Sequence, residues 1–151
     1  MKDQLVMLEL AIRIAVNAHA GQLDKAGVPY ILHPLRVMNT LHYVEDKIVG
    51  VLHDTVEDTD VTFEVLAERG FSDVIIAGVD SVTHRKGESW KGFIARCKVN
   101  DIGRRVKKAD MRDNSDLHRL KSVEEKHLAM IRKYHYGMQE LRTPGKVYVT
   151  S

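Results

Sequence analysis

Residues 53–59 read His-Asp-Thr-Val-Glu-Asp-Thr and concentrate one histidine and three acids at the end of an apolar segment. A second histidine precedes Pro34, and a further aspartate lies in the segment 107–114, Lys-Lys-Ala-Asp-Met-Arg-Asp-Asn. The candidate metal ligands in these three stretches are His33, His53, Asp54 and Asp110. Two imidazole nitrogens and two carboxylate oxygens suit a divalent ion of the manganese, iron or zinc group better than calcium or magnesium.

Two more acids, Glu57 and Asp58, follow the His53-Asp54 pair within about one helical turn. A carboxylate close to a metal ion can accept a proton from the water that attacks a substrate. So many acids around one point would repel one another without a cation, and their clustering therefore itself favours a bound metal. The pattern predicts a metal-dependent hydrolase.

The composition indicates one soluble globular domain. The 151 residues are 44% hydrophobic and 29% charged, and no apolar run approaches the length of a membrane span. The N-terminus lacks a secretion signal, and the lone Cys97 cannot form an internal disulfide, so we expect a cytoplasmic protein. A net charge of +2 argues against a protein that binds nucleic-acid polymers. The sequence does not determine the oligomeric state.

Helical periodicity dominates the chain, and strand-like alternation is not evident. Helices are predicted from about 4 to 20, from Pro34 to Leu41, from about 45 to 53, between a cap at Thr62 and Gly70, from a cap at Ser72 to Val82, from 89 or 90 to about 99, from a cap at Asp101 to about 113, and from a capping box at Ser122 and Glu125 to about 141. We therefore predict an all-α domain, a compact bundle of about eight helices over residues 1–142, followed by a polar tail at 143–151.

Three motifs resemble a known family. They are Tyr-Ile-Leu-His-Pro at 30–34, the stretch at 53–59, and Lys-x-Ala-Asp-x-x-x-Asn at 107–114. Together they resemble the HD-domain metal-dependent phosphohydrolases, and among them the hydrolase domain of the RelA/SpoT alarmone enzymes, over nearly all of residues 10–120. The resemblance implies an enzyme that removes pyrophosphate from the 3′ position of (p)ppGpp to give GDP or GTP. Because little chain follows the hydrolase region, we expect a small stand-alone alarmone hydrolase without a synthetase domain.

The resemblance also implies roles for individual residues. The four candidate ligands match the family's manganese ligands, although other divalent ions also bind such a set. Glu57 and Asp58 match the acids that orient or activate the attacking water, and Asn114 matches a residue that contacts the nucleoside. Lys25 matches the second residue of an Arg-Lys pair of the alarmone hydrolases. A polyphosphate substrate needs further cations, and Lys86, in the loop after the fifth predicted helix, is a candidate.

Asp24 departs from the family pattern, because it stands where the family has an arginine that packs against guanine. A carboxylate cannot supply that cation–π contact. It could accept hydrogen bonds from the guanine edge, or it could signal another nucleotide substrate. Two alternatives therefore stay open, an HD phosphohydrolase that acts on another nucleotide phosphate and a non-catalytic HD-fold binding partner. Glu57 and Asp58 argue against the second alternative, because a binding module has no need of acids that handle water.

Overall fold

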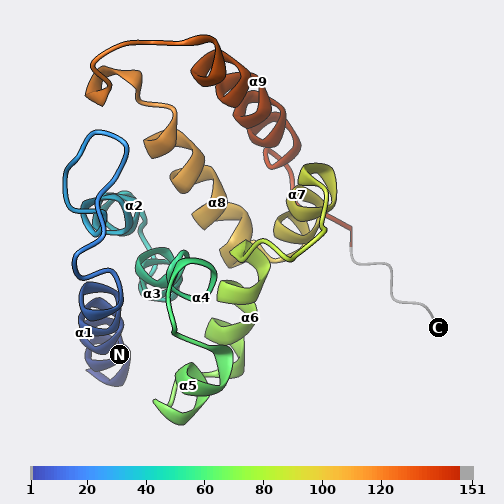
Figure 1. The fold of residues 1–151 in the computed structure, drawn as a ribbon. Helices are drawn as coiled ribbons and strands as arrows, with labels where there is room; N and C mark the ends of the chain where they lie inside the picture. The colour runs from blue at the N-terminus through green and yellow to red at the C-terminus, as the bar shows by residue number, and fades with distance from the viewer. Residues whose placement is uncertain (1, 147–151) are drawn as a thin grey trace.

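The computed structural model describes residues 2–146, and its secondary structure is helical (Figure 1). The helices are α1 (Lys2–Ala18), α2 (Leu32–Thr40), α3 (Val44–Leu52), α4 (Thr55–Asp58), α5 (Phe63–Glu68), α6 (Asp73–Val82), α7 (Trp90–Val99), α8 (Asp101–Asn114), the 3-10 helix η1 (Leu117–Arg119) and α9 (Glu125–Glu140). Within residues 2–146 the β-structure is limited to an isolated antiparallel bridge between Leu23 and Pro29. The predicted all-α fold class is confirmed.

Helix α3 occupies the centre of the bundle and packs against α1, α2, α6 and α8. Its second half is apolar, and the side chains Ile48, Val49, Val51 and Leu52 are at most 2% exposed. Because α3 is enclosed in this way, the residues that follow its last turn enter the interior of the domain. This is how His53, at 2% exposure, comes to be buried.

A close approach of α2 to α3 brings the two histidines together. A Cβ atom at Gly50 would lie 2.6 Å from Leu41 Cδ1 and 3.5 Å from the Cα atom of Met38 on α2. A larger residue at this position would have to displace the Leu41 side chain, so Gly50 helps α2 to lie close against α3. His33, in the first turn of α2, is consequently held beside the end of α3.

Helix α8 lies between α3 and α9 (Figure 1) and turns one buried face toward α3. This face includes Val106, Ala109 and Asp110. At Gly103, a Cβ atom would lie 1.9 Å from Ser81 Oγ, so α8 also contacts α6 closely. Asp110 thus faces the end of α3 from across the core.

Most predicted helix starts are confirmed, and two predicted caps were wrong. Thr62 and Ser72 accept the expected backbone hydrogen bonds at the starts of α5 and α6, and Ser89, where a helix start was predicted without a cap, caps α7. At α8 the cap is Asn100, whose Oδ1 accepts from Gly103 N at 2.8 Å, and not the exposed Asp101. At α9 the capping box does not involve Ser122, because Glu124 N donates to His127 Nδ1 at 2.9 Å.

The stretch at 53–59 does not simply end the third predicted helix. Helix α3 ends at Leu52, and Thr55–Asp58 forms a separate single turn, α4. The Thr55 hydroxyl donates to Leu52 O at 2.7 Å and joins the two elements. Helix α4 therefore turns Glu57 and Asp58 onto the surface while His53 stays inside.

The predicted polar tail at 143–151 is described only in part. In its first residues, Gly145 N donates to Lys98 O at 2.9 Å, and residues 147–151 lie outside the described part of the chain. The domain boundary at 142 stays a prediction. Among residues 2–146 no helix combines the length and the apolarity that crossing a membrane requires.

A buried ion pair between α3 and α8 should stabilise the arrangement that positions the site. Arg105 Nε and its terminal nitrogen donate to the Asp46 carboxylate at 2.6 and 2.8 Å, and Asp46 is 1% exposed. We expect Asp46→Ala to lower the free energy of unfolding by about 1.5–3 kcal/mol, because it removes the charge-assisted hydrogen bonds that join the two helices. Denaturant titration measures this change.

Glu140→Ala is the matched control, since the Glu140 carboxylate is 43% exposed and pairs with Lys98 at 3.4 Å. Loss of that surface pair should cost about 0–1 kcal/mol. Equal destabilisation by the two variants would contradict a special role for the Asp46–Arg105 pair.

A candidate metal centre and the cavity beside it

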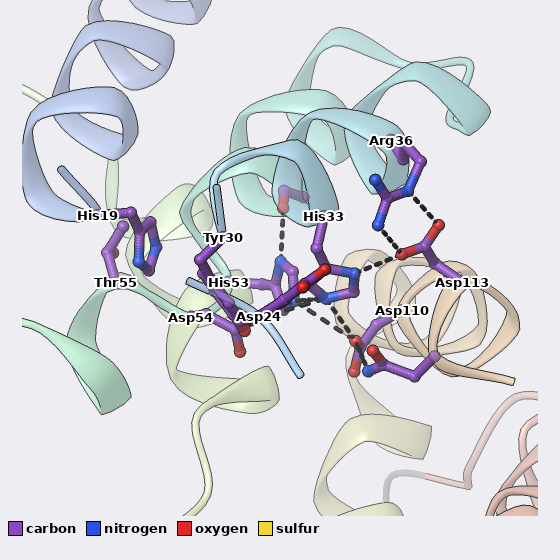
Figure 2. Close-up of polar contacts among 12 residues, drawn as sticks. His19, Asp24, Tyr30, His33, Arg36, His53, Asp54, Thr55, Asp110 and Asp113 are labelled. Carbon is purple, nitrogen blue, oxygen red and sulfur yellow. Dashed lines mark hydrogen bonds and ion pairs between the residues drawn. The ribbon is translucent and has the colours of Figure 1, made fainter. Parts of the chain in front are cut away.

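The four candidate ligands meet in the interior from α2, α8 and the turn between α3 and α4 (Figure 2). His33 Nε2 lies 3.2 Å from His53 Nε2 and 3.1 Å from Asp110 Oδ1. His53 Nε2 lies 2.9 Å from Asp54 Oδ2 and 3.5 Å from Asp110 Oδ1. One ligand atom each of His33, His53 and Asp54 lies within 4.8 Å of the other two, which makes this trio a possible metal site.

These spacings fit a shared ion. Ligands about 2.1 Å from one ion lie about 3 Å apart when they occupy neighbouring positions around it. The nitrogen–nitrogen and nitrogen–oxygen distances of 2.9–3.6 Å have this size. The donor set combines imidazole with carboxylate, which is typical of first-row transition ions.

The hydrogen bonds of the two imidazoles point their free lone pairs at each other. His53 Nδ1 lies 2.6 Å from the carbonyl oxygen of Gly50, which can only accept, so Nδ1 carries the proton. His33 Nδ1 likewise donates to Asp113 Oδ2 at 2.6 Å. In the neutral rings both Nε2 atoms then present lone pairs at 3.2 Å, which is repulsive unless a cation or a proton lies between them. The residues present therefore fit a metal ion.

Neighbouring groups hold the two carboxylates of the centre. Asp110 accepts from Lys107 Nζ at 2.7 Å and from Asn114 Nδ2 at 2.8 Å, and the Tyr30 hydroxyl donates to Asp54 Oδ2. Burial opposes the charge of Asp110, but the ammonium of Lys107 and, when they are protonated, the two imidazoles outweigh it and keep the pKa of Asp110 well below its usual range. Asp110 is therefore an anion in the core and needs cations around it.

Asp113 was not recognised from the sequence as part of the site, and it contacts His33 directly. Figure 2 shows Asp113 between the His33 imidazole and the Arg36 guanidinium, which donates to it at 2.7 and 3.0 Å. Burial opposes ionisation, but the hydrogen bonds from His33 and Arg36 lower the pKa of Asp113 far below its usual range. A carboxylate on the outer nitrogen of a ligating histidine fixes the orientation of the ring and increases its basicity. The available signal was spacing, because Asp113 follows Asp110 by three residues and Arg36 follows His33 by three, so each pair shares a helix face.

The two acids predicted to handle water lie on α4, next to Asp54, and are exposed. Glu57 Oε1 accepts from the backbone of His84 at 2.7 Å, so this carboxylate also holds the loop that follows α6. Burial and the negative charges of Asp54 and Glu57 raise the pKa of Asp58. Asp58 is therefore a stronger base than an ordinary surface aspartate.

A cavity of about 300 Å³ opens beside His33. Its lining residues are Leu23, Asp24, Lys25, Ala26, Tyr30, His33, Asn114, Asp116, Arg119, Leu120, His127 and Met130. Lys25 and Asn114, two of the predicted substrate contacts, thus share one cavity with the candidate metal ligand His33. The third, Lys86, is exposed in the loop after α6 and does not line this cavity. The structure therefore brings together two of the three predicted substrate residues.

Asp24 stabilises the loop before α2 through hydrogen bonds to its backbone. Its Oδ1 accepts from Ala26 N at 2.8 Å and from Val28 N at 3.2 Å, and its own backbone nitrogen donates to Val28 O at 2.8 Å. This is the hydrogen bonding by which an aspartate organises a tight turn. The other oxygen, Oδ2, lies 3.8 Å from Arg119.

The chain is similar in sequence to proteins named as GTP pyrophosphokinases and as guanosine-3′,5′-bis(diphosphate) 3′-pyrophosphohydrolases. A probable GTP pyrophosphokinase of Mycobacterium leprae is 42% identical over 86 residues, which cover 54% of this chain and 11% of that protein. A guanosine-3′,5′-bis(diphosphate) 3′-pyrophosphohydrolase of Aquifex aeolicus is 40% identical over 80 residues, which cover 50% of this chain and 11% of that protein. The resemblance to the RelA/SpoT enzymes is confirmed. No protein-family model matches the chain.

A solved structure shows the same fold over nearly the whole chain. It belongs to a metazoan ortholog of SpoT that hydrolyzes ppGpp, and it aligns with a TM-score of 0.76 at 22% identity over 90% of this chain and 85% of that one. The matched segments make up only 8–13% of the length of the curated relatives, which are therefore much longer proteins. Similarity to them is therefore similarity to one part of a larger enzyme.

Removal of the Asp113 carboxylate should weaken metal binding without removing a ligand. We expect Asp113→Ala to raise the dissociation constant for Mn²⁺ about 10- to 100-fold, because His33 loses the partner that orients it. Isothermal titration calorimetry, in which Mn²⁺ is added to the metal-free protein, measures this dissociation constant. Asp101→Asn removes a carboxylate charge at the exposed start of α8 and should leave binding unchanged. A normal Mn²⁺ affinity in Asp113→Ala would contradict the positioning role.

The turn at Asp24 should depend on its acceptor oxygen and not on its charge. We expect Asp24→Ala to speed hydrogen exchange at the Ala26 and Val28 amides by roughly 2- to 10-fold, because each amide loses a hydrogen bond that contributes about 0.5–1.5 kcal/mol. Asp24→Asn keeps an oxygen in place and should remain near the wild-type rate. If the alanine and asparagine variants exchanged alike, the carboxylate would not hold the turn.

Proposed function

We propose that this chain is a manganese-dependent phosphohydrolase that removes pyrophosphate from the 3′ position of (p)ppGpp. The observation that carries the proposal is the pair of buried imidazoles whose Nε2 atoms face each other at 3.2 Å between two carboxylates, next to a cavity. Relatives from Aquifex aeolicus and Borreliella burgdorferi named as 3′-pyrophosphohydrolases support the substrate. The proposed partner is accordingly a small-molecule nucleotide.

In this proposal His33, His53, Asp54 and Asp110 hold the ion, which when bound polarises a phosphoryl oxygen and lowers the pKa of water. The chain's own groups prepare this set. The Gly50 carbonyl and Asp113 keep both Nδ1 atoms protonated, and Lys107 offsets the charge of Asp110. Tyr30, whose pKa is raised by burial and by Asp54, stays a neutral donor to that carboxylate.

Asp58 is the best candidate for the base that accepts the proton of the attacking water. It is exposed, it lies one helical turn from Asp54, and its raised pKa increases its basicity. Glu57 is partly committed to the backbone of His84, so it is better placed to orient the water or the loop. Lys25 and Asn114 line the cavity and would contact the nucleotide, whereas Lys86 would have to reach the phosphates from outside it.

A second candidate is hydrolysis of another nucleotide phosphate at the same centre. Asp24 favours it, because a carboxylate lines the cavity where the family has an arginine. Purified protein loaded with Mn²⁺ and tested against ppGpp, pppGpp and a panel of other phosphorylated nucleotides distinguishes the two. Cleavage of another nucleotide but not of ppGpp would reject the alarmone and keep the phosphohydrolase.

The acids on α4 should serve chemistry and not metal binding. We expect Asp58→Asn and Glu57→Gln to retain Mn²⁺ and to lower kcat for ppGpp by roughly 10²- to 10⁴-fold, the usual contribution of positioned acid–base groups. Both variants keep the shape of the side chain, and the amide oxygen that Glu57→Gln introduces could still accept from the backbone of His84. Turnover is followed by release of pyrophosphate.

His53→Ala is the contrasting variant, because it should lose metal and turnover together. Near-wild-type turnover by both amide variants would contradict the proposed handling of water. Loss of Mn²⁺ from either amide variant would instead assign that acid to the ligand set.

A further inference from the structure

The guanidinium of Arg119, at the end of η1, forms part of the cavity wall beside His33. One terminal nitrogen donates to the backbone oxygen of Asp113 at 2.8 Å and lies 3.4 Å from its Oδ2. The other lies 3.8 Å from Asp24 Oδ2. Two acids from different segments therefore hold the group in one orientation.

The edges of this guanidinium face the protein. Both terminal nitrogens point at acids, and Nε is buried and has no hydrogen-bond partner among residues 2–146. The side chain is nevertheless 31% exposed. What it offers to a molecule in the cavity is consequently its flat face and not its donor edges.

The rest of the wall suits a flat, largely apolar ring. Leu23, Leu120 and Met130 line the same cavity. A planar cation stacks well on an aromatic ring, and apolar side chains cover the remainder of such a ring. We propose that the base of the nucleotide substrate stacks on the face of the Arg119 guanidinium.

The position agrees with the proposed function, on which this inference rests for the nature of the substrate. Asp113 Oδ2 accepts from His33 Nδ1 and also faces Arg119, so the guanidinium is one carboxylate away from a candidate metal ligand. A nucleotide whose 3′-phosphates reach the metal centre would have its base in the adjoining cavity. Arg119 would thus determine affinity for the nucleoside and not the rate of the chemical step.

The test is binding of guanosine 3′,5′-bisphosphate, which lacks the pyrophosphate linkage, to the Mn²⁺-loaded protein. We expect Arg119→Gln to raise its dissociation constant about 2- to 30-fold, the range of a cation–π contact. Adenosine 3′,5′-bisphosphate should lose affinity similarly, because every base has an aromatic face. Inorganic pyrophosphate, which has no base, should bind the variant and the wild type equally.

Arg36→Gln is the matched control. Arg36 also pairs with Asp113, but it does not line the cavity, so this variant tests effects that act through Asp113 alone. It should change Mn²⁺ affinity more than nucleotide affinity measured at saturating Mn²⁺, whereas Arg119→Gln should do the reverse. Arg119→Lys, which keeps the charge but not the plane, should weaken both nucleotides less than Arg119→Gln does.

Three results would overturn the inference. The first is that Arg119→Gln binds both nucleotides as tightly as the wild type does. The second is an equal loss of affinity for pyrophosphate, which would make Arg119 a phosphate contact. The third is a loss of Mn²⁺ affinity as large as that in Arg36→Gln. Turnover of ppGpp by the wild type tests the proposed function separately. A wild type that cleaves no ppGpp but whose nucleotide binding weakens on Arg119→Gln would reject that function and support the stacking site.

Discussion

The two Nε2 lone pairs that face each other at 3.2 Å inside the core are the constraint on which the site depends. Gly50 imposes this geometry in two ways. Its missing side chain lets α2 lie against α3, and its carbonyl oxygen accepts from His53 Nδ1 and so turns Nε2 toward His33. The missing side chain thus favours the close approach of the two helices, and the backbone carbonyl, which any residue would supply, directs one of the rings.

The second requirement is that the negative charges of the site are neutralised. Two of these charges come from α8. Asp110 and Asp113 lie three residues apart on this helix, and each is held by a cation or by an imidazole proton. Asp113 is contacted by His33, by Arg36 and, at the cavity wall, by Arg119. It therefore connects the candidate metal centre to the wall of the cavity, so a displacement of His33 or of Arg119 would act on the other through this carboxylate.

Sequence patterns predicted the parts of the site that depend on short motifs. Apolar periodicity and caps such as Thr62 and Ser72 located the helices, because these signals act within one or two turns. The partners of His33 could not be predicted in the same way, since Asp113 lies 80 positions away in sequence and meets it only through packing of α8 against α2. Arg119 was missed for a different reason, because η1 is too short to show periodicity.

Asp24 shows how a local substitution takes its meaning from the fold. In the sequence, it replaces a cation by an anion next to the predicted substrate contact Lys25. In the structure one of its oxygens holds the turn at residues 26 and 28, and the other faces the guanidinium of Arg119. The cavity therefore keeps a planar cation, which comes from η1 and is oriented by the acid in the loop. A charge reversal at one position need not reverse the electrostatics of a site when the fold brings an opposite charge to the same wall.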